Sequence, residues 1–279
     1  MKEKTHYTAL IFDMVESRKF KDRFALQSYI KAAVEICNTV FAKSICKPVM
    51  FSAGDEMQGL FYTAQEAYRY FAFFSRLVYP VQLRCGIGLG ELDVFSADWM
   101  TTELDGPAYH RAREAIARCH EGQEQPVLFN SESPGDRFIN GFLGSYLLLT
   151  QALKPKTTIL YIYAEFLDSH LVPQWEDLVT LVASIEAHLI QQQLLCKNTI
   201  SSYNPIFSLT LEETCFEEPD STGGDRLMIS QSWKRGLNGR IAQTLGIRRQ
   251  YVDAVVRTNN FAQLRTFEAL IVEKLQEVT

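Results

Sequence analysis

Hydrophobic and polar positions follow two different spacings in the first part of the chain. Tyr7–Met14 is an apolar run of β-forming residues that reaches an aspartate near its end, which predicts a buried strand. Apolar residues then recur at helical spacing over Phe24–Ala42. Val49–Phe51 and Met57–Tyr62 flank a Gly-Asp pair, the pattern of two strands joined by a tight turn. The pattern predicts a strand, a helix and a hairpin.

The next segments continue this alternation. Thr63 with Glu66 three residues later is typical of a capping box at a helix start. Helices are expected at Thr63–Leu77 and from about Asp105 to Ala117, and strands within Val81–Leu92 and at Val127–Asn130. The resulting order β-α-β-β-α-β-α-β predicts an α+β fold with a ferredoxin-like core and additions, over a first domain of residues 1–138.

After residue 138 the spacing becomes mainly helical, and we expect a second, all-α domain over residues 139–279. Helices are predicted at Phe142–Leu153, Thr157–Leu171 and Pro173–Leu195, although Thr157–Phe166 is rich in β-forming residues and a strand is the alternative. Residues 198–226 mix Ser, Asn, Pro, Gly and acidic residues, which indicates a long connection.

Two short helical patterns near the C-terminus, within residues 234–260, predict a helix-turn-helix. In Asn238–Arg257 a glycine, Gly246, separates the two patterns, and a glycine accepts the left-handed conformation at a tight helix end. Ala242 is small where the second helix must cross the first. The face of the second helix would carry the candidate DNA-contacting residues, with a further one on the first helix: Arg240, Arg248, Arg249, Gln250, Tyr251 and Arg257.

Charge supports this interpretation. The 279-residue chain has a net charge of −5, yet residues 234–265 contain seven basic residues and one acid, a net charge of +6 that leaves −11 for the rest. A basic segment on an acidic protein is typical of a module that binds a polyanion, so DNA is the predicted partner. The alternative is a solvated charged face on helices that only pack on the first domain. The last helical pattern, Phe261–Val278, either closes this module or forms the seam of a homodimer.

Two aspartates in the first domain are candidate metal ligands. Asp13 ends the first strand and Asp55 follows Gly54 in the predicted hairpin. In a β-α-β-β core these strands are neighbours, so both carboxylates can reach one place and share Mg²⁺ or Mn²⁺. The alternative is that both are ordinary turn residues.

These segments resemble a known family. IFDMVESR with Asp13, SAGDEMQGLF with Asp55, LRCGIGLGEL and DGPAYHRAREAI follow the order of landmarks in class III nucleotidyl cyclase domains. FDMVESR, GDEMQ and DGPAYHRAREAI, followed by a helix-turn-helix, resemble the SatD family of bacterial proteins still more closely. The resemblance implies a cyclase-type fold over about residues 5–130 and metal contact by the two aspartates.

The chain departs from the cyclase pattern where the chemistry would occur. The resemblance implies a catalytic Asn where this chain has His110, an Arg where it has Glu114, and a base-reading Lys near Phe51. We therefore expect weak or no cyclisation of nucleoside triphosphates. Candidate nucleotide-binding residues are Glu16, Ser17 and Arg18 after the first strand, together with His110 and Arg111.

Composition narrows the remaining classes. The chain is 47% hydrophobic and 22% charged, as in globular proteins, and neither a secretory signal nor a membrane-spanning apolar run is visible, so we expect a cytoplasmic protein with no membrane partner. None of its six cysteines forms a CxxC pair, which argues against a zinc site. The leading hypothesis is a DNA-binding regulatory protein with a degenerate cyclase-like domain that binds a nucleotide and Mg²⁺ or Mn²⁺. An enzyme acting on nucleoside triphosphates through Asp13 and Asp55 is the alternative, and an adaptor without either activity is the third hypothesis.

Overall fold

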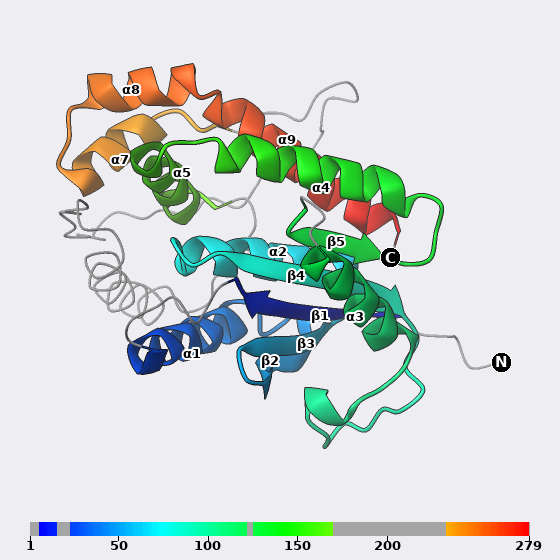
Figure 1. Ribbon diagram of the computed structural model, residues 1–279. Helices are drawn as coiled ribbons and strands as arrows, with labels where there is room; N and C mark the ends of the chain where they lie inside the picture. Colours follow the sequence, from blue (N-terminus) through cyan, green and yellow to red (C-terminus); the bar gives the residue numbers. More distant parts are fainter. Residues whose placement is uncertain (1–5, 16–22, 122–124, 170–232, 279) are drawn as a thin grey trace.

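A five-stranded sheet lies below a layer of helices in the computed structural model, which describes residues 6–15, 23–121, 125–169 and 233–278 (Figure 1). The strands are β1 (Tyr7–Met14), β2 (Ile45–Ala53), β3 (Glu56–Phe61), β4 (Leu83–Gly90) and β5 (Val127–Asn130). The helices are α1 (Arg23–Val40), α2 (Ala64–Leu77), α3 (Pro107–His120), α4 (Asp136–Gln151), α5 (Pro155–Leu167), α7 (Leu237–Leu245), α8 (Arg249–Thr258) and α9 (Phe261–Glu277). The protein is therefore of the α+β class.

The sheet has the strand order β2-β3-β1-β4-β5. β1 is central and pairs antiparallel with both β3 and β4, β2 pairs antiparallel with β3, and β5 pairs parallel with β4. The predicted hairpin is confirmed, because Gly54 adopts φ +63° between β2 and β3. A positive φ is nearly free of strain only for glycine.

Alternation along β1 assigns its two faces to different helices. Leu10 and Phe12 belong to the main core, which also contains residues of α1 and α2, whereas Ala9 and Ile11 pack in a smaller cluster with α3. Successive side chains of a strand point to opposite faces, so both faces of β1 are covered and its continuous apolar run is explained.

The glycines of β4 bring α3 unusually close to the sheet. A Cβ atom on Gly88 would lie 2.2 Å from the Ala108 carbonyl oxygen, and one on Gly86 would lie 2.2 Å from that of Ala112. Any larger residue at either place would push α3 away. The glycines of β4 therefore allow α3 to pack closely on the sheet.

The second half of the described chain is helical. α5 is a helix over Pro155–Leu167, so the strand alternative for that segment is wrong. α9 buries Leu264, Ile271 and Leu275, and the main core extends from α1 and α2 without a break into α4, α5, α7, α8 and α9. α9 therefore packs into this core. The division into domains at residue 138 stays a prediction, as do Pro173–Leu195 and 198–226, which lie outside the described residues.

No helix in the described part of the chain combines the length and the apolar character needed to cross a membrane.

Candidate functional site

The helix pair α7–α8 has a tight left-handed turn. Gly246 ends α7 with φ +62° and ψ +31°, and the Ile247 amide donates to the Ala242 carbonyl oxygen at 3.0 Å. The Asn238 side-chain amide donates to Asp253 at 2.7 Å and joins the two helices. Ala242 is buried, as the crossing of a second helix requires.

α8 presents most of its surface to solvent. Val252 is the residue of α8 that is fully buried. Five of the six residues predicted to contact DNA are exposed on this helix or at its start: Arg248, Arg249, Gln250, Tyr251 and Arg257. We call these five residues the α8 face. These five side chains are not buried against the sheet, a placement that would have excluded contact with DNA.

Other basic residues of this segment are engaged within the protein. Arg240 donates to the Leu167 carbonyl oxygen at 2.6 Å and so holds α7 on the end of α5. Lys234 pairs with Asp168 at 3.0 Å, and Arg265 is only 2% exposed. The net charge of +6 counted along the sequence therefore overstates the charge that is available to a partner.

Asp13, the first predicted metal ligand, already has two basic partners. Its Oδ1 accepts from Arg84 Nε at 3.0 Å, and its Oδ2 lies 2.7 Å from His120 Nε2. The side chain lies on the α3 face of β1, as the alternation with Ile11 requires, and the residue is 7% exposed. In this structure Asp13 joins β1 to β4 and to the end of α3.

Asp55 lies at the same end of the sheet as Asp13. The register pairs Phe12 with Met57, and Asp55 precedes β3 in the turn of the hairpin. It is partly exposed. The two aspartates thus come from neighbouring strands, as predicted, and their sharing of a metal ion stays a prediction. Glu16, Ser17 and Arg18 lie outside the described residues.

His110 and Arg111 lie at the opposite end of α3 from Asp13. Gly90, at the far end of β4 from Arg84, is the strand residue next to the start of α3. Ten residues of helix separate His110 from His120, or roughly 15 Å at the α-helical rise. The structure therefore does not bring the two predicted nucleotide-binding residues of α3 together with the aspartates in one chain.

Both of these residues contact the protein itself. Arg111 donates to the Leu89 carbonyl oxygen at 2.7 Å and to Glu132 at 2.5 Å, which ties α3 to β4 and to the loop after β5. His110 Nε2 lies 3.6 Å from Asp105 and its side chain is 60% exposed. Of the two, His110 is the more accessible to a ligand.

Sequence reasoning missed the partners of Asp13. Arg84 is a charged residue in an otherwise apolar strand, and the direct pairing of Asp13 with Arg84 across β1 and β4 makes their ion pair possible. The sequence does contain this signal, because a single charged residue in a buried strand needs a partner. His120 carried no such signal, since a histidine at a helix end is usual.

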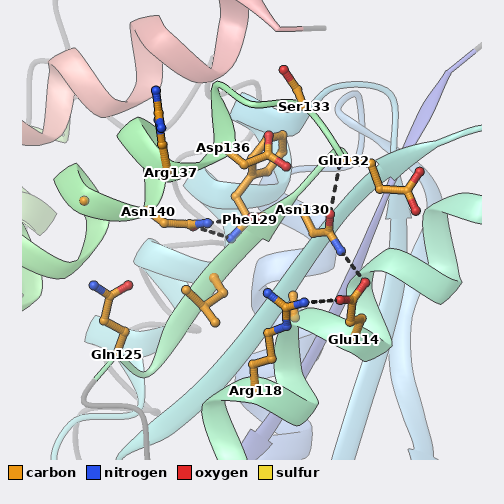
Figure 2. Close-up of a pocket in the computed structure, with 13 residues that line it drawn as sticks. Glu114, Arg118, Gln125, Phe129, Asn130, Glu132, Ser133, Asp136, Arg137 and Asn140 are labelled. Carbon is orange, nitrogen blue, oxygen red and sulfur yellow. Dashed lines mark hydrogen bonds and ion pairs between the residues drawn. The ribbon is translucent and has the colours of Figure 1, made fainter.

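An open cleft of about 810 Å³ lies between α3, β5 and the start of α4 (Figure 2). Its rim carries both signs of charge, with Glu114 paired to Arg118 and bonded by Asn130. Asn140 closes the outer edge of β5, because its side-chain oxygen accepts from the Phe129 amide at 2.7 Å and its nitrogen donates to the Phe129 carbonyl at 2.8 Å. This edge strand is therefore protected from pairing with another strand.

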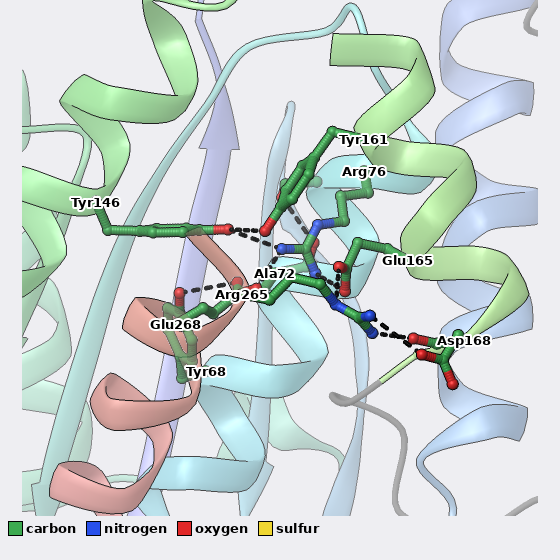
Figure 3. Close-up of polar contacts among 10 residues, drawn as sticks. Tyr68, Ala72, Arg76, Tyr146, Tyr161, Glu165, Asp168, Arg265 and Glu268 are labelled. Atoms are coloured by element: carbon green, nitrogen blue, oxygen red, sulfur yellow. Dashed lines mark hydrogen bonds and ion pairs between the residues drawn. The ribbon is translucent and has the colours of Figure 1, made fainter. Parts of the chain in front are cut away.

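Buried charges join the helical layer to the sheet layer. We call Arg76, Glu165, Asp168, Arg265 and Glu268 the buried charge cluster (Figure 3). Arg76 of α2 lies 2.5 Å from Glu268 of α9 and 3.5 Å from Glu165 of α5, and Arg265 lies 2.9 Å from Glu165. With Lys234 on Asp168, three positive charges balance three negative ones.

Tyrosine hydroxyls complete this cluster. Arg76 donates to the Tyr146 hydroxyl at 2.9 Å, which lies 3.2 Å from that of Tyr161. Burial raises the pKa of both tyrosines above the ordinary value of 10.0. Burial alone would lower the pKa of Arg265, but the carboxylates of Glu165 and Asp168 outweigh it and raise that pKa. The cluster is desolvated, and its positive and negative charges balance through ion pairs.

Comparison with known proteins identifies the family of this chain. The sequence profile of the SatD family matches residues 7–152, more than half of the chain. The chain belongs to the SatD family.

Two solved structures of a bacterial light-regulated adenylyl cyclase are similar to this chain at 14% sequence identity, with TM-scores of 0.33 and 0.34. Each alignment covers 45% of this chain and 43% of the other, so the chain spans less than half the length of these relatives. No curated protein matches the sequence.

Proposed function

We propose that α7 and α8 form a helix-turn-helix that binds double-stranded DNA, and that the protein is a DNA-binding regulator. The observation that carries this proposal is the α8 face, which combines three arginines, a glutamine and a tyrosine on one accessible helix. Arginine and glutamine make paired hydrogen bonds to the major-groove edges of guanine and adenine, and arginine also binds phosphate.

The geometry of the helix pair supports this function. In helix-turn-helix proteins the N-terminal residues of the second helix contact the bases. Arg248, Arg249 and Gln250 occupy that end of α8, and Arg257 lies in its last turn, where it can reach a flanking phosphate. Arg240 was predicted to contact DNA too, but its bond to the Leu167 carbonyl favours a role in holding α7 in place.

Fluorescence anisotropy with genomic duplex fragments at low ionic strength tests the proposal. The double variant Arg248→Ala/Arg249→Ala should lose most of the binding, whereas the matched control Arg113→Ala, an exposed arginine on α3, should bind as the wild type does. Gln250→Ala should relax the preference at one base pair while retaining affinity for other sequences. An equal loss of DNA affinity in Arg113→Ala would show that binding depends on overall charge and not on the α8 face.

The salt dependence measures how many phosphates are contacted. Each phosphate that is neutralised contributes about −0.9 to the slope of log K against log salt, so Arg257→Ala should make the slope shallower by about that amount. Absence of salt-sensitive DNA retention would contradict the proposal and leave the adaptor hypothesis in its place.

A second candidate function belongs to the sheet domain, whose first four strands support a ferredoxin-like arrangement through their order and antiparallel directions. We propose that Asp13 and Asp55 bind Mg²⁺ or Mn²⁺ together with the phosphates of a nucleotide. Both aspartates lie at the same end of the sheet, which favours this role. The two basic partners of Asp13 oppose it, because a cation must displace them or share the carboxylate with them.

Calorimetric titration of Mn²⁺ with ATP or GTP into the full chain tests this candidate. Asp55→Asn should abolish the metal-dependent heat without affecting the fold, and Asp93→Asn, a carboxamide change away from this end of the sheet, is the matched control. We expect little or no cyclic nucleotide from the same mixtures, because each lost oxyanion-type donor costs about 10²–10³ in rate. Rapid cyclisation would instead establish the enzyme hypothesis.

A further inference from the structure

The outer face of α4 is apolar along its length. Four of its side chains are far more exposed than core residues: Phe138 60%, Phe142 44%, Leu148 71% and Leu149 50%. The sequence from Phe138 to Leu153 contains no charged residue. A contiguous exposed apolar surface of this kind marks an interaction site in a globular protein.

The exposed positions on α4 repeat every seven residues. Phe138, Ser145 and Ala152 are seven apart, Gly141 and Leu148 follow by three, and Phe142 and Leu149 follow by four. All seven of these positions are exposed. This is the a, d and e spacing of a helix that packs lengthwise against another helix. We call these positions the α4 stripe.

Neighbouring side chains hold the aromatic residues of the stripe on the surface. The Phe142 ring meets the Phe267 ring of α9 edge to face, with centroids 5.9 Å apart. The Arg137 guanidinium lies 5.4 Å from the Phe138 ring centroid. These contacts favour rings that stay exposed over rings that fold back into the core.

We propose that the α4 stripe binds the same stripe of a second copy of this chain, with the two α4 helices antiparallel. Ser145 is the midpoint between Phe138 and Ala152. A two-fold axis at Ser145 therefore places the large Phe138 of one copy opposite the small Ala152 of the other, and Phe142 opposite Leu148. A face that is complementary to itself in this way suits a two-fold homodimer.

Charges at the two ends of α4 select the antiparallel arrangement. At the start of the helix Glu132 is paired with Arg111, and Asp136 and Arg137 cancel, whereas Lys154 and Lys156 give the region after its end a charge of +2. Antiparallel helices keep the two basic ends apart. Parallel helices would bring the two basic ends together.

This inference does not depend on DNA binding. Sedimentation analysis of the full chain should give twice the mass of one chain at micromolar concentration. Leu149→Glu and Leu148→Glu should each weaken association about tenfold or more, because each buries a charge without a partner. The matched control Phe24→Glu, at an 82% exposed phenylalanine on α1, should leave the dimer intact. Circular dichroism and thermal unfolding check that each variant folds.

Cysteine crosslinking tests the orientation. Ser145→Cys should give a crosslinked dimer under mild oxidation, because the two Ser145 residues face each other on the axis. Phe138→Cys should not, since its two copies would lie roughly 20 Å apart along the helices. The wild type gives the background from the native cysteines. A monomeric wild type, a dimer that Leu149→Glu leaves unchanged, or equal crosslinking of both cysteine variants would overturn the proposal.

Discussion

Arginines close together in the C-terminal sequence occupy two opposite environments. Arg249 and Arg257 on the α8 face are exposed, and the one ionic partner described for Arg249 is a weak contact with Asp253 at 3.8 Å. Arg265, eight residues after Arg257, is 2% exposed and forms ion pairs with both Glu165 and Asp168. The same side chain can thus serve an external partner or the fold, and burial decides which.

The difference has an energetic consequence. An exposed ion pair contributes about 0–1 kcal/mol, whereas removing one partner of a buried pair leaves an uncompensated charge. The buried charge cluster should therefore control the free energy of unfolding, and the α8 face should control binding. The following variants test that separation.

The largest effect is expected for Arg265→Met. Methionine leaves the carboxylates of Glu165 and Asp168 without their main partner, so the free energy of unfolding should fall by about 3–5 kcal/mol in urea titrations. Arg249→Met on the α8 face is the matched control and should change stability by less than about 0.5 kcal/mol. Similar losses of stability in both variants would contradict the different roles assigned to the buried and the exposed arginines.

A double-mutant cycle measures how strongly two residues of the buried charge cluster interact. Arg76→Met and Glu268→Gln should each destabilise the protein, and the double variant should lose less than the sum of the two. The coupling free energy should lie toward the upper end of about 0.5–3 kcal/mol, because the pair is buried and 2.5 Å apart. A coupling near zero would mean that water screens this pair.

Alkaline pH should reduce the stability of the protein through the tyrosines that contact the buried charge cluster. Burial raises the pKa of Tyr146 above its unfolded value of 10.0. The stabilisation is complete below pH 10.0 and is lost as the pH rises above it, because the unfolded state then releases the tyrosine proton first. The urea midpoint should decline above this pH by an amount equivalent to at most about 1.4 kcal/mol per pH unit for this group. Tyr146→Phe should flatten the decline, and an identical slope in that variant would contradict the assignment.

The smallest effect on the fold is expected for Arg257→Ala. Its free energy of unfolding should match that of the wild type within about 0.5 kcal/mol. Under the proposed function, affinity for all DNA sequences should nevertheless fall about tenfold, since a charge-assisted phosphate contact contributes about 1.5 kcal/mol. Anisotropy titrations on two unrelated duplexes measure this loss. A change in stability without a change in affinity would place Arg257 with the buried arginines.

Local patterns predicted most of the described elements correctly. The hairpin followed from a Gly-Asp pair between apolar runs, and Gly54 does adopt a positive φ. Thr63 caps α2 and accepts from the Glu66 amide at 3.4 Å, as the capping-box pattern indicated. Thr157–Phe166 was ambiguous because β-branched residues can also fill a buried helix, and packing on other helices resolved it.

Sites were harder to predict than elements. The pattern placed Asp13 at the end of a strand but could not show that Arg84 and His120 would occupy its carboxylate. It predicted metal contact by Asp13 and nucleotide contact by His110 within one domain but not the distance between them, and α3 places His110 roughly 15 Å from the aspartate end of the sheet. Contacts between residues far apart in sequence leave no periodic signal.

The sequence by itself determined the order of helices and strands, the glycine turns and the excess of basic residues near the C-terminus. These features depend on neighbours within a few positions, through backbone sterics and apolar spacing. The tertiary structure alone decided which charges are buried. Arg265 and Arg257 look alike along the chain, but only Arg265 meets α5, where desolvation makes an ion pair part of the fold and leaves the α8 arginines to the solvent.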